Sequence, residues 1–252
     1  MTRVAIVTGG QRGIGFGIAQ ALIDSGWTTA ITSPEEPSAD AVVAAMRELG
    51  PNCGYFQHDL RDTDGFNSVV ADIEAQLGPI DTLVGNAGVP TQSRGDLLEL
   101  GAESFDTVMS INTRGTFFFA QAVARRMVAT NATGFRSIVF ITSVSADVAS
   151  IDRGDYCMSK AASAMAARLF AARLANDDIS VFDVRPGIIS SPMTDPVFDK
   201  YDDRIAEGLV PARRWGTPQD VGSTVAALVA GGLPFSTGAV IPVDGGLGLH
   251  RL

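Results

Sequence analysis

Tyr156 and Lys160 are the residues of this sequence best suited to acid–base chemistry. They are four positions apart, so on a helix their side chains project from the same face. A phenol is a poor acid or base near neutral pH, but an adjacent ammonium favours its ionised form. Ser143 follows an apolar run, and its hydroxyl can hydrogen-bond a substrate oxygen. A structural tyrosine packed beside a lysine stem has the same spacing, so the pair alone is weak evidence for catalysis.

A glycine-rich turn near the start of the chain has the character of a phosphate-binding loop. Gly9, Gly13 and Gly15 follow the apolar run 4–7 and precede a helical pattern. Glycines allow a tight turn and let the backbone approach a pyrophosphate, which would lie at the helix N-terminus. An ordinary turn can have the same composition, but the position between a strand and a helix is the one that a dinucleotide site requires.

The elements that would position these residues alternate along the whole chain. Strands are expected at 4–7, 27–32, 53–58, 81–85, 136–142, 179–184 and 239–243, and helices at about 13–26, 39–49, 65–77, 105–129, 156–175 and 217–230. This alternation predicts a single-domain, doubly wound parallel α/β sheet over residues 1–252, Rossmann-like, with about seven strands and helices on both faces. Ligands bind at the carboxyl ends of such strands, so the residues that follow the strands should meet at one edge.

Charge and composition exclude several classes of partner. The chain has 252 residues and a net charge of −9, which argues against nucleic acid or an anionic membrane surface as the main partner. We find no signal pattern and no apolar stretch that could span a bilayer. The two cysteines and two histidines have no metal-ligand spacing, so no metal site is expected. We expect a cytoplasmic protein with free thiols.

Seven short motifs, in order and spacing, resemble those of the short-chain dehydrogenase/reductases, in their compact single-domain branch. They are Thr8-Gly-x-x-x-Gly-Ile-Gly15, Asn86-Ala-Gly88, Asn112, Ser143, Tyr156-x-x-x-Lys160, Pro186-Gly187 and Val243-Asp-Gly-Gly246. Each motif alone is weak, but the set covers nearly the whole chain and is specific. The resemblance implies an NAD(P)-dependent enzyme that transfers a hydride between nicotinamide and a ketone or secondary alcohol.

The resemblance also implies a role for each catalytic residue. Tyr156 would be the general acid in reduction and the base in oxidation. Lys160 would favour the phenolate and bind the nicotinamide ribose, and Ser143 would orient the substrate carbonyl. Asn112 would hold a water that relays protons from Lys160. A mid-helix asparagine bonded to a local carbonyl is the alternative for Asn112.

The cofactor contacts implied by the resemblance follow the strand ends. Asp59 would accept a hydrogen bond from the adenine amino group, the turn 86–88 would lie along the adenine ribose, and Ile189 would meet the nicotinamide carboxamide. Ser191 stands where the family often has threonine. The full set is Gly9, Arg12, Gly13, Ile14, Gly15, Ser33, Asp59, Leu60, Asn86, Ala87, Gly88, Tyr156, Lys160, Pro186, Gly187, Ile189 and Ser191.

The end of the second strand bears on the choice between NAD and NADP. An acidic residue there would bind the ribose hydroxyls and repel a 2′-phosphate, but this chain has Ser33-Pro34. Ser33 can donate to a phosphate and Arg12 can pair with it, so we favour NADP and keep NAD open. A solvent-exposed Arg12 that selects neither cofactor is the alternative.

The substrate is expected to be a small carbonyl or alcohol compound beneath a lid at 192–211, a stretch rich in charged and turn residues. Met193, Val197 and Phe198 could form an apolar wall there, and Arg153 lies between the catalytic serine and tyrosine. In overall appearance the chain resembles 3-oxoacyl-(acyl-carrier-protein) reductases. The acidic stretch 176–178 would repel an acidic carrier protein, so this partner is kept as a disfavoured alternative.

Two further expectations concern catalysis and assembly. A non-catalytic dinucleotide sensor could use the same fold, although a sensor has no need of Ser143, Asn112, Tyr156 and Lys160 together. The helix 105–129 and the helix that follows Tyr156 are apolar on more than one face. A helix of that kind is buried, in some proteins by another subunit, and with the resemblance this favours a homotetramer, with a dimer as the next choice.

Overall fold

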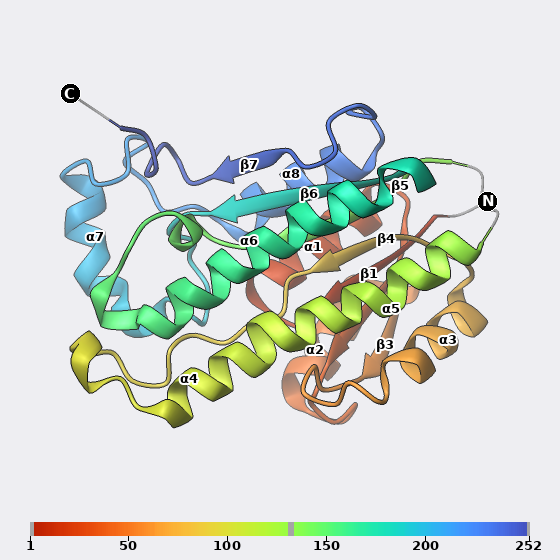
Figure 1. Ribbon diagram of the computed structural model, residues 1–252, viewed down its shortest axis with the longest axis horizontal. Coiled ribbons are helices and arrows are strands. Elements are labelled where there is room, and N and C mark those ends of the chain that lie inside the picture. The colour runs from red at the N-terminus through yellow and green to blue at the C-terminus, as the bar shows by residue number, and fades with distance from the viewer. Residues whose placement is uncertain (1–2, 131–133, 251–252) are drawn as a thin grey trace.

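The computed structural model describes residues 3–130 and 134–250 and contains one seven-stranded sheet. Every neighbouring pair of strands is parallel, in the order β3-β2-β1-β4-β5-β6-β7 (Figure 1). The strands are β1 Val4–Thr8, β2 Thr28–Ser33, β3 Cys53–Gln57, β4 Ile80–Gly85, β5 Arg136–Ile141, β6 Ile179–Pro186 and β7 Val240–Val243. The predicted doubly wound parallel sheet is therefore confirmed.

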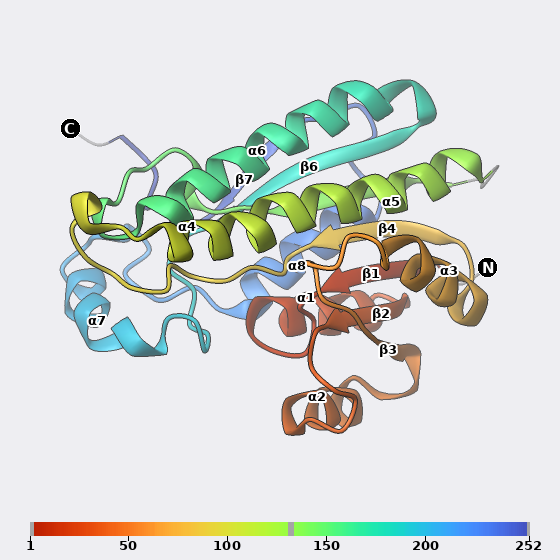
Figure 2. The ribbon, with the colours of Figure 1, turned by 60° about the horizontal axis from the view of Figure 1, so that its bottom comes forward.

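Helices cover both faces of this sheet. They are α1 Gly13–Asp24, α2 Asp40–Leu49, α3 Phe66–Leu77, α4 Ala102–Met109, α5 Thr116–Ala129, α6 Gly154–Leu174, α7 Phe198–Ala206 and α8 Pro218–Val229. The helices α3, α5 and α6 share one buried cluster with the sheet, and α1, α2 and α8 share the other. Figures 1 and 2 show α5 and α6 on one side of the strands, with α1 and α8 on the other.

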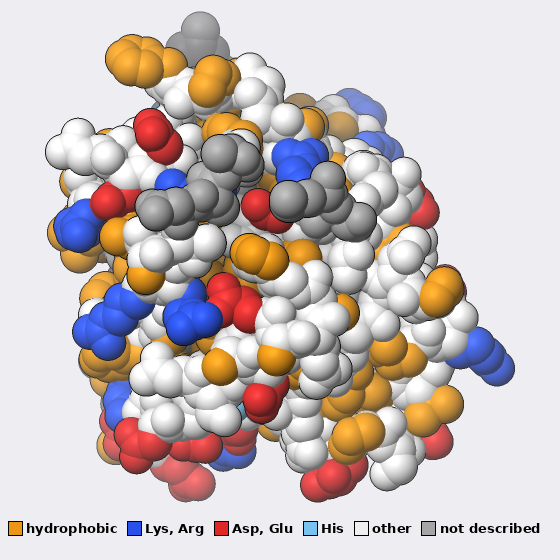
Figure 3. Space-filling view, turned by 90° about the vertical axis from the view of Figure 1, so that its right-hand side faces the viewer, with side chains coloured by type: hydrophobic (Ala, Val, Ile, Leu, Met, Phe, Trp, Pro, Cys, Tyr) orange, Lys and Arg blue, Asp and Glu red, His pale blue; other side chains and the backbone are white. Residues whose placement is uncertain are grey.

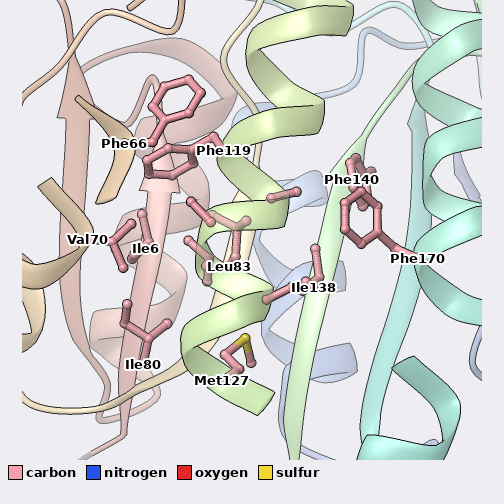
Figure 4. Packing of buried hydrophobic residues seen from close by; sticks show 14 of the residues in the cluster. Ile6, Phe66, Val70, Ile80, Leu83, Phe119, Met127, Ile138, Phe140 and Phe170 are labelled. Carbon is pink, nitrogen blue, oxygen red and sulfur yellow. The ribbon is translucent and has the colours of Figure 1, made fainter. Parts of the chain in front are cut away.

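The central strands place apolar residues on both of their faces because both faces are covered. In β6, Val181 belongs to the cluster beneath α5 and α6, while Phe182 and Val184 belong to the opposite cluster. Aromatic rings fill the first cluster between helices and strands (Figure 4). The rings of Phe66 and Phe119 meet edge to face with centroids 5.3 Å apart. This two-sided packing fixes the strand ends from which the candidate site is built.

Two stretches differ from the sequence expectations. The single helix expected at 105–129 begins earlier, at Ala102, and is interrupted by a π-helical turn at Ser110–Gly115. Gly115 lies so close to Leu60 that an added Cβ would overlap the Leu60 carbonyl oxygen, so the interrupted helix packs tightly there. The stretch 192–211, expected as a turn-rich lid, contains the helix α7, which lies beyond the carboxyl ends of the strands (Figure 1).

The opposite edge of the sheet, at the amino ends of the strands, has a mixed surface. Figure 3 shows acidic and basic side chains interspersed over this face, with apolar side chains between them. None of the helices in the described residues is long and apolar enough to cross a membrane. The concave site described below lies at the other edge.

Candidate active site

A cavity of about 680 Å³ lies at the carboxyl ends of the strands and gathers almost every residue predicted for the site. The predicted residues in its wall are Gly9, Arg12, Gly13, Ile14, Gly15, Ser33, Asp59, Leu60, Asn86, Ala87, Gly88, Ser143, Tyr156, Lys160, Pro186, Gly187, Ile189 and Ser191. Asn112 is the one predicted residue behind the wall, although its neighbour Ile111 lines the cavity. Residues far apart in the sequence meet here because parallel strands present their carboxyl ends on one edge.

Tyr156 and Lys160 lie one helical turn apart at the start of α6. The Lys160 Nζ is 5.7 Å from the centre of the Tyr156 ring and donates a hydrogen bond of 3.1 Å to the Ile141 carbonyl oxygen. Lys160 is buried, and an ammonium has three protons to donate. With one described acceptor, it keeps donors for hydroxyl groups of a ligand while its charge stays beside the phenol.

Ser143 follows β5 and caps the short 3₁₀ helix Val144–Ala146. Its Oγ accepts a hydrogen bond of 3.0 Å from the backbone N–H of Ser145. The Ser143 hydroxyl proton has no acceptor among the described residues, so it can be donated to a ligand in the cavity. The Ser145 Oγ is buried without a partner among the described residues and lines the same wall.

Asn112 lies in the π-helical turn and bonds across the fold, not to a local carbonyl. Its Oδ1 accepts from the Val89 N–H at 2.8 Å, and its Nδ2 donates to the Val89 carbonyl at 3.0 Å and to the Ser159 Oγ at 3.1 Å. π-turns often occur at functional sites. A Cβ added to Gly88 would be 3.1 Å from the Asn112 Oδ1 and 3.6 Å from the Lys160 Nζ, so this glycine leaves room for both groups.

The glycine turn has the form that a pyrophosphate requires. Gly9 and Gly13 have positive φ angles of 67° and 56°, which favour glycine. A Cβ on Gly15 would overlap the Gly9 carbonyl oxygen and lie 2.5 Å from the Asn86 Nδ2. At the N-cap of α1, the Arg12 side chain makes no capping hydrogen bond. The first N–H groups of α1 therefore remain available to a phosphate, and the loop fits the pyrophosphate of a dinucleotide.

At the adenosine end, the side chains that favoured NADP are already engaged. The Arg12 Nη2 is 2.8 Å from a Glu35 carboxylate oxygen, and the Ser33 Oγ is 2.8 Å from the Tyr55 hydroxyl. The sequence analysis assigned no role to Glu35. The available signal was an acidic residue two positions beyond the strand end.

Asp59 also has a partner at this end of the cavity. Arg61 holds the Asp59 carboxylate at 2.6 Å. The hydrogen bond from Arg61 lowers the pKa of Asp59 below its ordinary value. Asp59 is therefore an ionised residue of the cavity wall, and each of its carboxylate oxygens accepts two hydrogen bonds from Arg61.

Asp155, directly before Tyr156, is a buried residue that the sequence analysis missed. Its carboxylate accepts from the Ser104 Oγ at 2.6 Å, the Thr91 Oγ1 at 3.0 Å and the Tyr156 backbone N–H at 2.7 Å. These bonds connect the start of α6 to α4 and to the loop after β4. Asp155 therefore fixes the helical turn that carries Tyr156, and an acidic residue in a first helical turn was the only sequence signal.

The far end of the cavity is formed by loops and by the segment around α7. Asp152 lies 3.2 Å from an Arg94 nitrogen and 3.7 Å from the Lys200 Nζ, so it connects the loop after β4 with α7. Met193 and Val197 line the cavity as expected. Phe198 does not line it. The Phe198 ring stacks on Trp215 with centroids 4.7 Å apart.

No group of three or more potential ligand residues that could hold a metal is present in the described part of the chain. The chemistry that this arrangement supports is proton transfer at a ligand oxygen, next to a loop that fits a dinucleotide.

Comparisons with known proteins agree with this geometry. A family model described as enoyl-(acyl carrier protein) reductase matches residues 9–248. The 3-oxoacyl-(acyl-carrier-protein) reductase MabA of Mycobacterium tuberculosis is 33% identical over 99% of this chain and 94% of its own. FabG of Staphylococcus aureus, a protein of the same description, is 30% identical over 98% of each chain. A crystal structure of a 3-oxoacyl-(acyl-carrier protein) reductase from Brucella melitensis in complex with NAD superposes with a TM-score of 0.95, at 47% identity and over 100% and 99% of the two chains.

Proposed function

Because the chain belongs to the short-chain dehydrogenase/reductases and is an NAD(P)-dependent oxidoreductase, we propose that it interconverts a ketone and a secondary alcohol with Tyr156 as the general acid and base. The observation that carries this proposal is the shared cavity. Ser143, Tyr156 and Lys160 line the same wall as the glycine turn. A nicotinamide dinucleotide held by that turn would supply or accept the hydride at the substrate carbon.

The side chains of this protein handle the proton. In reduction, Tyr156 gives its hydroxyl proton to the carbonyl oxygen, and in oxidation it takes a proton from the alcohol. The Lys160 ammonium, 5.7 Å from the ring centre, stabilises the phenolate that remains after donation. Ser143 donates to the same substrate oxygen, because its Oγ already accepts from the Ser145 N–H. Asn112 holds the π-turn against Val89 and Ser159, and we propose that a water beside it returns protons to Lys160.

The test is reduction of a panel of carbonyl compounds, followed by the loss of reduced-nicotinamide absorbance. The panel should contain ketones, oxo esters, oxo acids and sugars, each with NADH and with NADPH. We expect turnover of at least one class, and its loss in Tyr156→Phe. Tight nucleotide binding with no turnover of any class would contradict the proposal.

A 3-oxoacyl-(acyl-carrier-protein) reductase is the second candidate. Its support is that relatives at 33% and 47% identity have this name. Against it stands the acidic stretch 176–178, although Asp177 is partly neutralised by Arg173 at 2.7 Å. A 3-oxoacyl thioester on its carrier protein, compared with the same acyl group on a short thiol, tests this reading. A large preference for the carrier-bound form would favour the carrier-protein reductase.

For the cofactor, we propose a preference for NAD over NADP, the opposite of what Ser33 and Arg12 led us to expect. The support is the Glu35 carboxylate beside Arg12, because a 2′-phosphate placed there would meet a negative charge and compete for the guanidinium. The Ser33 hydroxyl, bonded to Tyr55, adds little to a phosphate site. The crystallised Brucella relative at 47% identity contains NAD.

Titrations with NADH and NADPH test this preference. We expect a lower Kd for NADH in the wild type, and a smaller gap between the two in Glu35→Gln. Glu36→Gln is the matched control, because Glu36 contacts Gln57 and not Arg12. A lower Kd for NADPH in the wild type would restore the original expectation.

We further propose one catalytic domain over the whole chain, with 192–211 as a lid and α5 and α6 as subunit contacts. The support for the lid is that Met193, Val197 and Leu209 line the cavity.

The support for assembly is the set of exposed apolar side chains on α5 and α6, namely Phe118, Val128, Met158, Met165 and Leu169. Light scattering should give a homotetramer, and Leu169→Asp should shift it toward smaller species. The free thiols of Cys53 and Cys157 suit the reducing cytoplasm that we propose as its location.

A further inference from the structure

The cavity wall is strongly cationic although the protein is not. The chain has a net charge of −9. As far as the structure describes the wall, its single carboxylate is Asp59, and its cationic side chains are Arg12, Arg61, Arg94, Arg153, Lys160 and Arg204. A dinucleotide pyrophosphate accounts for positive potential near the glycine turn. The pyrophosphate does not account for the arginines at the substrate end of the cavity.

Most of these cations already have a partner. Arg12 is paired with Glu35 and Arg61 with Asp59, both at the adenosine end. Arg94 is paired with Asp152, and Lys160 donates to a backbone carbonyl. Arg153 and Arg204 form no ion pair with any residue that the structure describes. The unpaired charge therefore lies at the substrate end of the cavity.

Arg153 is the one of these two that is placed to act on the reacting group. Its guanidinium carbon is 5.5 Å from the centre of the Tyr156 ring. Its Nε is buried and has no hydrogen-bond partner among the described residues. The backbone beneath it is fixed, because its N–H donates to the Ser150 carbonyl oxygen at 3.2 Å. The Arg153 side chain also lines the cavity. A guanidinium without a counter-charge is unfavourable here, so a negatively charged ligand group in the cavity would stabilise it.

Arg204 lies on α7, on the lid side of the same cavity. Its guanidinium carbon is 5.9 Å from the centre of the Tyr201 ring, and the residue is exposed. Arg204 therefore adds positive potential on the lid side, while Arg153 stands over the Tyr156 ring. Val144, Val148 and Met193 add apolar side chains to the same wall. Such a wall suits a compact substrate with one charged end.

From these contacts we infer that the carbonyl substrate carries a carboxylate, which Arg153 binds through its two-pronged guanidinium beside the reacting carbon. This inference rests on the proposed function, because it takes Tyr156 as the residue that serves the carbonyl oxygen. A guanidinium matches a carboxylate with two parallel hydrogen bonds and fixes its orientation. Since Arg153 lies next to the Tyr156 ring, the carboxylate must be within a few bonds of the carbonyl. The substrate class is a short oxo acid, or the hydroxy acid formed from it.

The reaction stays balanced with this substrate. Two electrons and a proton arrive at the carbonyl carbon as a hydride from the reduced nicotinamide, and Tyr156 gives a proton to the carbonyl oxygen. The carboxylate keeps its charge throughout and only orients the molecule.

The test compares 2-oxobutanoate and acetoacetate with their methyl esters, which are isosteric in the reacting part but uncharged. For the wild type we expect kcat/KM to be at least about tenfold higher for the acids, as for a hydrogen bond to a charged group. Arg153→Gln should remove most of this preference by lowering kcat/KM for the acids and not for the esters. Arg153→Lys should restore part of the preference for acids, because an ammonium keeps the positive charge but cannot form the two parallel hydrogen bonds of a guanidinium.

Arg173→Gln is the matched control. Arg173 belongs to α6, which begins directly after Arg153, but it is exposed, paired with Asp177, and absent from the cavity wall. This variant loses the same charge and should keep the wild-type preference. Calorimetric titration of the NAD-bound enzyme with butanoate gives a second measurement without turnover, and binding should be lost in Arg153→Gln. An unchanged Kd for NAD in that variant shows that it is folded.

Two kinds of failure can be told apart. If the wild type reduces the esters as well as the acids, or Arg153→Gln lowers both equally, the carboxylate inference is overturned and the proposed function stands. If no carbonyl compound of any class is turned over while NAD still binds, both are overturned.

Discussion

The two ends of the cavity are built in different ways. At the nucleotide end, the wall contains two tight backbone turns fixed by the sheet, the glycine turn after β1 and the turn 86–88 after β4, beside side chains such as Arg12 and Asp59. At the substrate end, the wall is made of side chains from the loops 90–94 and 144–153 and from the segment 192–209. Ion pairs connect these loops, with Asp152 between Arg94 and Lys200.

The two ends should differ in how many substitutions they tolerate. A backbone wall tolerates few substitutions, because its shape depends on glycines for which no other residue has room. A wall of loop side chains can change its charge and shape without disturbing the sheet, as loops on a rigid scaffold do. We therefore expect variants at the two ends to separate nucleotide binding from turnover.

Tyr156→Phe should give the largest separation between nucleotide binding and turnover. The change removes the proposed proton donor but keeps the ring, so kcat should fall by about 10²–10⁴-fold, the usual contribution of a general acid or base. The Kd for the nucleotide should change little, because the glycine turn and Lys160 are untouched. Steady-state rates and a fluorescence titration of NADH measure the two quantities. A variant that retains wild-type kcat would show that another group moves the proton.

Gly15→Ala should have the opposite effect, because it should weaken nucleotide binding directly. Its Cβ would overlap the Gly9 carbonyl oxygen and crowd the Asn86 Nδ2 at 2.5 Å, so the turn must open. We expect a nucleotide Kd raised by more than about tenfold and a loss of about 1–3 kcal/mol in the free energy of unfolding. Gly95→Ala is the control at the substrate end, because an added Cβ there meets nothing within 4 Å. Equal effects of the two substitutions would contradict the distinction between the ends.

The nucleotide end was largely predictable from the sequence for the same reason. Glycines spaced as Gly9, Gly13 and Gly15 are, directly after an apolar run, predict the conformation of a phosphate-binding turn. The seven strands and their order of appearance were predicted within a few residues, because buried parallel strands are rich in apolar residues. The residues after the strands then had to meet at one edge.

The remaining features depend on contacts that a sequence does not display. The π-turn at 110–115 forms where Asn112 bonds to Val89 and Ser159, which lie 23 and 47 positions away along the chain. The pairing of Arg12 with Glu35 depends on two loops that only the folded sheet brings together. Arg153 was noted for its position between the serine and the tyrosine, but only the structure shows that it lies over the Tyr156 ring and forms no ion pair with a described residue.

A smaller effect at the substrate end is expected for Asp152→Asn. The change removes the carboxylate that connects Arg94 with Lys200, so the segment around α7 should close less firmly over the cavity. Exposed ion pairs contribute up to about 1 kcal/mol, so KM for a substrate should rise by no more than about fivefold. The Kd for the nucleotide should stay constant. Asp177→Asn, in an exposed pair with Arg173 outside the cavity, is the control. A change in nucleotide Kd would show that the two ends are coupled.

The smallest effect should come from Asp220→Asn, beneath the nucleotide end. Asp220 completes the capping box of α8, and α8 packs on α1. Loss of the cap should cost about 1 kcal/mol of unfolding free energy at pH 7, with no change in kcat. The hydrogen bond from Arg214 holds the pKa of Asp220 well below its ordinary value.

A carboxylate with a depressed pKa contributes its stability above the unfolded-state value of about 4, and loses it as the pH falls further toward the folded-state value. Urea unfolding at several pH values should therefore give a constant difference between wild type and Asp220→Asn from pH 7 to 5, and a shrinking difference below about pH 4. A difference that grows on acidification would mean that the carboxylate does not stabilise the cap. In that case the support of α1 by α8 would have to come from apolar packing alone.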